Sequence, residues 1–357
     1  MSRVDTEKLK PGMVLKSDAY SYSDQLILPE GMVLNEKAID KLHQYGVTSV
    51  VIDDEAGVVP DTDETENSYA ARLRASAEFK KYQEDFESTV NIMSQSMADV
   101  VAKNAPLQAD MLVDEAMSIL HPESGDINVF DMVHNMRQYD DTTFAHSLNV
   151  GLICNVFAGW LGLSVPEIRL ATECGLFHDI GKLAIPEEII KKPGKLTDGE
   201  FAIVKTHPTE GYKILMKYDV DDHVRQAALM HHEKCDGSGY PLGLKAESID
   251  YYAKMVCIAD VYEAMTANRR YRDGLCPFTV IEAFENEGLQ KYDTAMIMTF
   301  LQKIVDTYMM NRVGLSNGLE GDIIFINKQR LSRPLVKCGD KYIDLMVEKD
   351  LRIERLL

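Results

Sequence analysis

The spacing of apolar residues divides the 357-residue chain into a helical middle part and β-type segments at both ends. From about residue 107 to 313, apolar positions recur every three or four residues, and capping or turn residues separate the runs. Thr197 followed by Glu200 is one such start signal, a capping box. Because strand-like alternation is nearly absent here, the pattern predicts a mainly α protein built on a bundle of seven or more helices.

Both ends of the chain contain short β-prone segments between turn signals. In residues 1–60 these segments are 13–15, 25–28, 32–34 and 47–52, and the tetrapeptide GMVL occurs at 12–15 and again at 31–34. The repeat fits either two similar strands of one small barrel-like unit or a chance similarity of two β segments. In residues 314–357 the expected strands are 323–326, 334–337 and 342–345, with Gly339-Asp340 as a tight turn. A small β-rich unit is therefore expected at each terminus.

Residues 61–106 are expected to form a linker and one long helix before the helical domain of residues 107–313. The segment 54–68 is acidic and rich in turn residues, and a helical pattern then continues to about residue 104. Its apolar residues step by four and three positions at Phe86, Val90, Met93, Met97 and Val100. The seam covers only about two heptads, so packing on the next domain is slightly favoured over a homodimer interface.

Composition and charge narrow the range of functions. The formal net charge of −19 argues against a protein that binds DNA, RNA or an anionic membrane through its overall charge, so an anionic ligand needs a locally basic site. No apolar run is long enough for a bilayer span, and the N-terminus lacks the apolar stretch of a signal peptide, so no membrane insertion is expected. The six cysteines are scattered without a CxxC pair, which indicates a reduced, cytoplasmic protein.

Five of the nine histidines lie in the helical part beside other residues that commonly bind metals. Each of them alone is more often a packed or solvated side chain than a ligand. Together they form, with two aspartates, an ordered set of nitrogen and oxygen donors: His146, His178, Asp179, His207, His231, His232 and Asp260. Such a set suits Fe, Mn, Ni or Co at least as well as Zn, and it is not a cysteine-type structural zinc site.

The adjacent pairs in this set indicate more than one metal ion. Neighbouring residues on a helix point about 100° apart, so His178 and Asp179, or His231 and His232, serve neighbouring ions or splay where a helix ends. The glycine-rich turn after His232 supplies such an end. Asp179, whose carboxylate has two oxygens, is the candidate bridge. A two-metal site is the usual apparatus for phosphoester hydrolysis, in which a bridging water loses a proton and becomes the nucleophile.

An anionic substrate would also need nearby cations. Lys182 follows His178 by one helical turn and could contact a phosphoryl oxygen or the leaving oxygen. Three arginines come shortly after the second aspartate of the donor set: Arg269, Arg270 and Arg272. Arginine side chains bind phosphate groups well, so the cluster could contact the substrate. Alternatively, the arginines could cap the C-terminus of a helix, where positive charges are favoured.

Three segments carry a resemblance to a known family: HDIGK (178–182), HHEKCDGSGYP (231–241) and ADVYEAMTANRRYR (259–272). Together they resemble the signature of the HD-GYP family within the HD phosphohydrolase superfamily, over roughly residues 130–310. The resemblance implies an HD-type helical fold and a metal-dependent phosphodiesterase. Its substrate would be cyclic di-GMP, with linear pGpG as the usual product and GMP as a further one in some members.

The resemblance also implies a role for each matching residue. Two divalent ions are expected, with iron or manganese ahead of nickel, cobalt and zinc. Asp179 would be shared between them and, with Lys182, would be catalytic. The ligands of one ion would be His146, His178, Asp179 and Asp260, and those of the other His207 and His231, with His232 in or next to the site. Lys182, Arg269 and Arg272 would contact the substrate phosphates. Gly237, Gly239 and Tyr240 would shape the loop beside the substrate. Glu233 and Asp236 would hold the metal ligands and the loop in place without binding a metal themselves.

Three positions depart from the family pattern. The glutamate that binds a third metal in some members is replaced by Thr142, with Asp141 beside it, so two ions are expected and efficient hydrolysis to GMP is not. Cys235 stands where a large aromatic residue is usual, and Arg270 stands where a proline is usual. Neither of the last two removes an expected ligand.

Two other functions stay open from the sequence. One is a signalling or adaptor protein that binds a cyclic dinucleotide and turns it over slowly, which the terminal β units and the 86–100 seam would suit. The other is an HD phosphodiesterase for a different cyclic dinucleotide, because the GSGYP loop does not specify which base is recognised.

Overall fold

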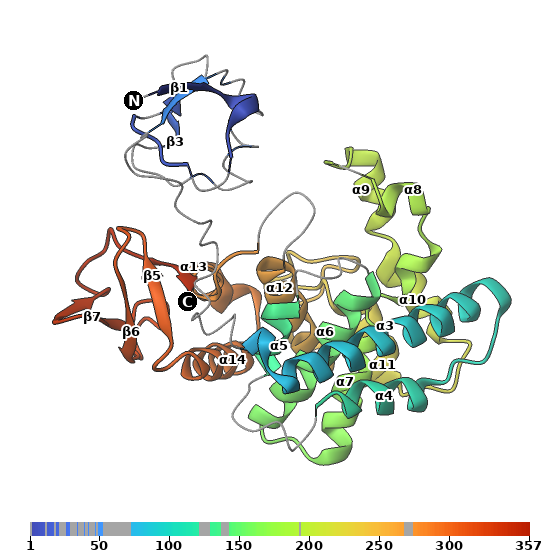
Figure 1. Cartoon of the computed structure of the whole chain (residues 1–357). Coiled ribbons are helices and arrows are strands. Elements are labelled where there is room, and N and C mark those ends of the chain that lie inside the picture. The colour runs from blue at the N-terminus through green and yellow to red at the C-terminus, as the bar shows by residue number, and fades with distance from the viewer. Residues whose placement is uncertain are drawn as a thin grey trace. The chain divides into compact units, whose positions relative to one another are not determined.

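The structure is a computed structural model, and it describes residues 2–10, 13–17, 19–20, 26–28, 34, 39, 42, 47, 49–52, 73–120, 129–136, 143–192, 194–267 and 274–357. The chain divides into two compact units, Met1–Ala75 and Ser76–Leu357. Figure 1 labels most of the helices and some of the strands.

The first unit consists of short antiparallel strands. Strand β1 (Ser2–Asp5) pairs with β4 (Ser49–Ile52), and β2 (Ala19–Tyr20) pairs with β3 (Leu26–Leu28). A 3-10 turn, η1 (Thr6–Lys8), follows β1. A small apolar core closes the unit, with Leu9, Leu15, Leu34, Leu42, Val47, Val50 and Ile52 buried. The expected small β-rich unit is confirmed, whereas the second GMVL segment lies largely outside the described residues.

The second unit begins with the long helix α3 (Ala77–Lys103), whose first turn is capped by the hydroxyl of Ser76. All five residues of the predicted seam are buried in this single chain. They face neighbours that include α4 (Ala109–Ser118), α5 (Val129–Met136) and α6 (Thr143–Trp160). The seam therefore serves packing within the chain, and a homodimer stays a prediction.

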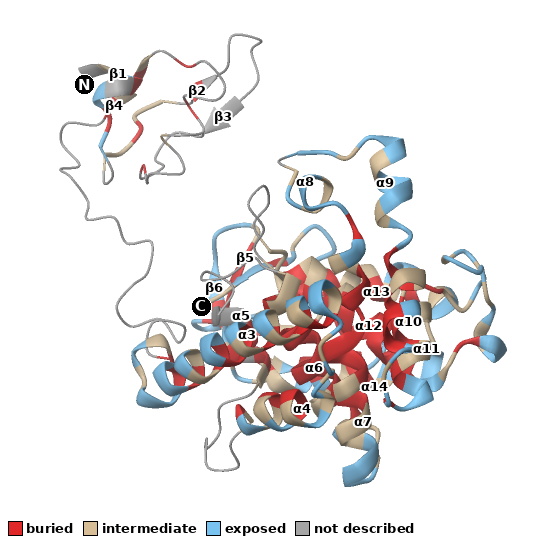
Figure 2. Ribbon diagram, turned by 90° about the vertical axis from the view of Figure 1, so that its right-hand side faces the viewer, coloured by how far each residue is buried: buried red, intermediate tan, exposed pale blue. Residues whose placement is uncertain are grey.

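The helical bundle surrounds α6, which is apolar on nearly all sides and buried along its length. Figure 2 shows the buried core where α6 packs against α12. The helices that follow α6 are α7 (Val165–Phe177), α8 (Glu187–Ile190), α9 (Asp198–Val204), α10 (His207–Leu215), α11 (Asp222–Met230), α12 (Tyr251–Thr266), α13 (Pro277–Lys291) and α14 (Thr294–Thr307). The 3-10 turns are η2 (Ile180–Ala184) and η3 (Ala246–Ser248). The capping box predicted from Thr197 and Glu200 starts α9, and the mainly α bundle is confirmed.

The C-terminal part forms an antiparallel sheet in the order β8-β7-β6-β5-β9. Its strands are β5 (Arg312–Leu315), β6 (Glu320–Phe325), β7 (Leu335–Cys338), β8 (Lys341–Asp344) and β9 (Ile353–Leu356). The three expected strands overlap β6, β7 and β8, and Gly339, with a φ of 58°, makes the turn between the last two. Strands β5 and β9 were not predicted; they are four residues long, too short for a clear alternation.

Candidate metal centre

The predicted donors come mostly from helix ends. His178 ends α7 and is followed by Asp179, while His231 ends α11 and is followed by His232. His207 is the first residue of α10. At a helix end, two adjacent side chains are free from the fixed angle of a regular helix, so both members of a pair can reach one centre. The remaining two donors lie within helices, in the first turn of α6 and midway along α12: His146 and Asp260.

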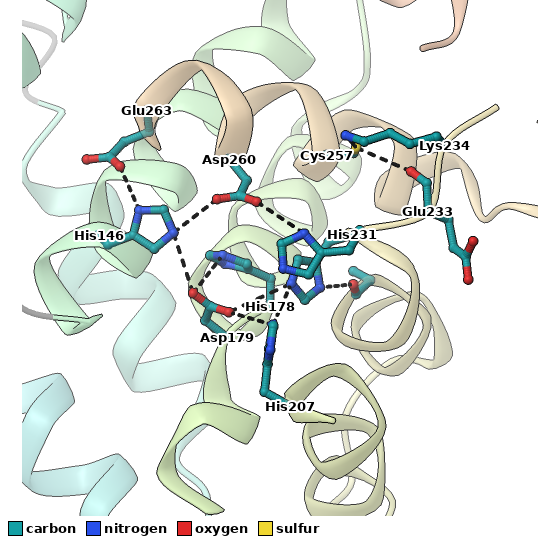
Figure 3. Close-up of polar contacts among 12 residues, drawn as sticks. His146, His178, Asp179, His207, His231, Glu233, Lys234, Cys257, Asp260 and Glu263 are labelled. Carbon is teal, nitrogen blue, oxygen red and sulfur yellow. Dashed lines mark hydrogen bonds and ion pairs between the residues drawn. The ribbon is translucent and has the colours of Figure 1, made fainter. Parts of the chain in front are cut away.

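Asp179 lies at the middle of the cluster, and each of its carboxylate oxygens faces a different pair of histidines (Figure 3). Oδ2 is 3.5 Å from Nε2 of His146 and 3.4 Å from Nε2 of His178. Oδ1 is 3.2 Å from Nε2 of His207 and 3.7 Å from Nε2 of His231. This is the arrangement that a carboxylate bridging two cations would adopt.

The donors fall into two groups around this carboxylate. The donor atoms of His146, His178 and Asp260 lie within 4.8 Å of one another, and so do those of His207, His231 and His232. The carboxylate of Asp260 lies between the groups, with its oxygens 3.1 Å from His146 Nε2 and 3.8 Å from His232 Nδ1. The structure thus brings all seven predicted donors together.

Hydrogen bonds at the outer nitrogen of four rings orient them toward the centre. Nδ1 of His146 lies 2.6 Å from a carboxylate oxygen of Glu263. In the other three rings Nδ1 donates to a backbone carbonyl, which keeps the proton on Nδ1 and leaves Nε2 with a free lone pair. These pairs are His178 with Gly175 at 2.7 Å, His207 with Val204 at 2.7 Å, and His231 with Ala228 at 3.0 Å.

The inward-facing atoms need a cation. Nε2 of His178 and Oδ1 of Asp179 are buried without a hydrogen-bond partner. Nε2 of His207 faces Nε2 of His231 at 3.2 Å, and two lone pairs at that distance repel each other unless a positive charge lies between them. The neutral nitrogens and carboxylate oxygens therefore fit divalent metal ions.

The electrostatics favour the ligand forms of three donors: His231, His232 and Asp179. His146 differs, because burial alone would lower its pKa, but Glu263 and Asp260 outweigh this effect and raise the pKa to about 10. Burial, reinforced by the neighbouring ring of His232, holds the pKa of His231 well below its usual range. Burial likewise lowers the pKa of His232 to about 3. Burial alone would raise the pKa of the Asp179 carboxyl, but Lys182 and His178 hold that pKa well below its usual range. Neutral imidazole and ionised carboxylate are the forms that act as ligands.

The turn η2 places a cation beside the bridging carboxylate. Nζ of Lys182 donates to Oδ2 of Asp179, and the lysine side chain keeps about a quarter of its surface exposed (26%). Gly181 lets this turn touch the start of α10. A Cβ on that residue would lie 1.9 Å from the carbonyl oxygen of His207 and 2.4 Å from the amide nitrogen of Gly211. Any other residue would therefore push α10, and its histidine, away.

The loop after the paired histidines folds back over the centre. The buried carboxylate of Glu233 accepts hydrogen bonds from backbone amides of the loop, those of Leu242, Gly243 and Leu244 at 2.6, 3.2 and 2.9 Å. The Tyr240 ring then stacks on His232, with centroids 4.7 Å apart and planes at 28°. A Cβ at Gly239 would lie 2.5 Å or less from the backbone of residues 232–234. This glycine thus allows the close return of the chain.

The tip of the same loop is held by hydrogen bonds within the loop. The carboxylate of Asp236 is exposed and accepts from the amide and hydroxyl of Ser238 at 2.9 and 2.6 Å, so it shapes the turn and does not contact a ligand. Gly237 has a φ of 85°, which favours glycine. The half-buried Cys235 is held through its backbone, whose amide donates to the carbonyl of Lys291 at 2.8 Å.

Some predicted residues lie outside the described residues, namely Asp141, Thr142, Arg269, Arg270 and Arg272. In contrast, Glu263 was not predicted. It is buried, and besides His146 it accepts a hydrogen bond from Nδ2 of Asn149 at 3.1 Å. It follows Asp260 by three residues, on the same face of α12, and that spacing was the only signal in the sequence.

The bundle and its histidine–aspartate centre define an HD-domain, metal-dependent phosphohydrolase. The HD-domain family profile matches residues 140–296. A cyclic di-GMP phosphodiesterase of Pseudomonas aeruginosa is 32% identical over 94% of this chain and 84% of its own length. The chain belongs to the HD-GYP family of HD-domain phosphodiesterases.

Two further relatives and one solved structure are also similar to this chain. A cyclic di-GMP phosphodiesterase of Thermotoga maritima is 37% identical over 50% of this chain and 50% of its own. The 3'3'-cGAMP-specific phosphodiesterase 1 of Vibrio cholerae is 40% identical over 41% of this chain and 34% of its own. A solved HDG"Y"P protein of Bdellovibrio bacteriovorus shares the fold, with a TM-score of 0.52 at 18% identity over 85% of this chain and 99% of that one.

Two further findings concern the N-terminal part of the chain and its helices as a whole. Residues 2–108 match a domain of unknown function, DUF3391. In the part of the chain that the structure describes, no helix is both long and apolar enough to cross a membrane.

Proposed function

We propose that this protein hydrolyses cyclic di-GMP to linear pGpG with two divalent metal ions, iron or manganese. The observation that carries the proposal is Asp179, whose two oxygens face two separate histidine pairs. The similarity to cyclic di-GMP phosphodiesterases of Pseudomonas aeruginosa and Thermotoga maritima supports the choice of substrate.

Each ion would be held by one of the two donor groups. The first would take His146, His178, Asp179 and Asp260, and the second would take Asp179, His207 and His231, with His232 beside them. When bound, the two ions would supply Lewis-acid activation of the phosphodiester and of water. The described fold supports this division because the Nδ1 bonds aim the Nε2 lone pairs inward.

The chain itself would orient the substrate and stabilise charge. Lys182 holds a proton at Nζ beside Asp179, from where it can donate a hydrogen bond to a phosphoryl or leaving oxygen. Tyr240 covers His232 and keeps water from that side of the centre. Arg269 and Arg272 are proposed phosphate contacts on the basis of the sequence motif alone.

The test is product analysis with purified protein. Anaerobically prepared protein is loaded with Mn²⁺ or Fe²⁺, analysed for metal, and incubated with cyclic di-GMP under reducing conditions before the products are separated. We expect about two equivalents of metal per chain and accumulation of pGpG. No pGpG with either metal would refute the proposal.

A matched pair of variants links the activity to the centre. Asp179→Asn removes the charge that both histidine pairs face, so both metal sites should weaken and turnover should fall by at least about 10³-fold. Asp219→Asn changes an exposed aspartate elsewhere and should leave metal content and turnover as in the wild type. Full turnover by Asp179→Asn would contradict the bridging role.

A second substrate class is tested in the same assay, because part of the chain is 40% identical to a 3'3'-cGAMP-specific enzyme. Faster turnover of that mixed dinucleotide than of cyclic di-GMP would replace the proposed substrate. Tight binding of cyclic di-GMP without hydrolysis, unchanged by His178→Ala plus Asp179→Ala, would instead indicate an adaptor. A cytoplasmic location belongs to the proposal, and the six free thiols, usual in a reducing compartment, support it.

A further inference from the structure

Lys205 lies at the rim of the metal centre, between α9 and α10. Its Nζ is 4.8 Å from the centroid of the Tyr240 ring and 5.1 Å from the centroid of the Phe201 ring. The ring of Tyr240 in turn stacks on His232, with centroids 4.7 Å apart. A row of contacts thus leads from the donors of the centre outward to an exposed ammonium group.

No described residue neutralises the charge of this lysine. Among the described residues, no carboxylate lies within ion-pair distance of Lys205. Three lysines close to it in the sequence do have such partners: Lys191 with Glu187, Lys192 with Glu200, and Lys213 with Glu210. In a chain of net charge −19, a lysine held over aromatic rings keeps its full charge available for an anion.

The segment before Lys205 adds an accessible aromatic surface. Helices α8 and α9 stand out from the bundle beside α10 (Figure 1). On α9 the side chains of Phe201 and Ile203 are 49% and 41% exposed. An exposed aromatic ring next to an unpaired cation offers what one nucleotide needs, a face for its base and a charge for its phosphate.

We propose that Lys205 binds the phosphate of the cyclic dinucleotide that is not being cleaved, with Phe201 offering its ring to a base. A cyclic dinucleotide carries two phosphates on opposite sides of its ring. When one lies at the metal centre beside Lys182, a cation at the rim can contact the other, in addition to Arg269 and Arg272, the phosphate contacts proposed from the sequence motif. This inference rests on the proposed function, and it assigns a second phosphate site to the α9–α10 segment.

The experiment compares a substrate with two phosphates against one with a single phosphate. Bis(p-nitrophenyl) phosphate carries one phosphate and reports on the metal centre, while cyclic di-GMP is used both as substrate and as a competitive inhibitor of that reaction. The variants are Lys205→Gln, Lys205→Arg, and Lys217→Gln as the control, a second exposed lysine at the far end of α10. Metal content is measured for each.

Lys205→Gln should raise the Ki and the KM for cyclic di-GMP about fivefold more than it raises the KM for the single-phosphate diester. Lys205→Arg should restore most of the affinity, and Lys217→Gln should behave as the wild type. The difference for Lys205→Gln should shrink as the salt concentration rises, because the contact is electrostatic.

The outcomes separate this inference from the proposed function. If cyclic di-GMP is not cleaved but still inhibits, and Lys205→Gln weakens that inhibition, the proposed function fails and the second phosphate site stands. If cyclic di-GMP is cleaved with equal affinity by Lys205→Gln and the wild type, the second site is overturned and the proposed function stands. Equal losses on both substrates, or loss of metal from the variant, would also overturn it.

Discussion

Glu263→Gln tests the hydrogen bond that orients the first histidine of the centre. Glu263 accepts from two donors, Nδ1 of His146 at 2.6 Å and Nδ2 of Asn149 at 3.1 Å. Glutamine keeps the shape but has only one acceptor oxygen, so one buried donor would face an NH₂ group. An unsatisfied buried donor of this kind lowers the free energy of unfolding by about 1–3 kcal/mol. Loss of the carboxylate that orients a ligand histidine weakens metal binding by about 10–100-fold.

The expected effect is confined to one of the two donor groups. His146 belongs to the first group, whereas His207 and His231 are held by backbone carbonyls. Titration of metal-free Glu263→Gln with Mn²⁺ should therefore show one equivalent bound as in the wild type and one bound about 10–100-fold more weakly. The kcat/KM should fall as the occupancy of the weakened site falls, and it should recover as the metal concentration rises.

The control is Glu188→Gln, an exposed glutamate on α8 that should change neither metal binding nor turnover. Thermal unfolding of the metal-free variant separates orientation from a general loss of stability. If Glu263→Gln bound both equivalents with wild-type affinity and kept its kcat/KM, the carboxylate would not orient His146 and the reasoning would be wrong.

Three further predictions concern the surroundings of the centre. Gly181→Ala should displace α10, remove the metal held by His207 and reduce turnover by about 10²-fold. Metal analysis of the folded variant checks this, and a full metal content would refute the prediction. Cys235→Trp should keep both metals and activity, because the hydrogen bonds that hold Cys235 are backbone bonds to Lys291 and Ala246; loss of metal would contradict this. Burial, with the charge of Asp110, raises the pKa of Glu173 from 4.5 to about 7. The protonated carboxyl therefore contributes to the free energy of unfolding in full below pH 4.5, and this stabilisation is lost as the pH rises through 7. Glu173→Gln should therefore unfold at a higher temperature than the wild type at pH 8 and not at pH 4, and equal melting curves at pH 8 would show that burial does not perturb the group.

Much of the fold follows from local patterns. The three-to-four spacing of apolar residues and the Thr197–Glu200 capping box correctly predicted helices. A helix is recognisable from its sequence because it needs one apolar stripe to bury and residues that satisfy the backbone amides of its first turn. Strands β5 and β9 were not predicted, because a four-residue strand has no readable alternation and forms only by pairing with its neighbours. For the seam on α3 the sequence only slightly favoured packing within the chain over a homodimer, and the burial of its residues shows that it packs within the chain.

The sequence by itself determined the chemistry of the centre, since the types and order of its donors imply nitrogen and oxygen ligands for hard or borderline metals. Tertiary structure decided how those donors are used. Only the approach of helix ends distant in the chain places one oxygen of Asp179 against each histidine pair. The same approach recruits Glu263 behind the first pair and Lys205 at the rim, because contacts between helices have no counterpart in local sequence spacing.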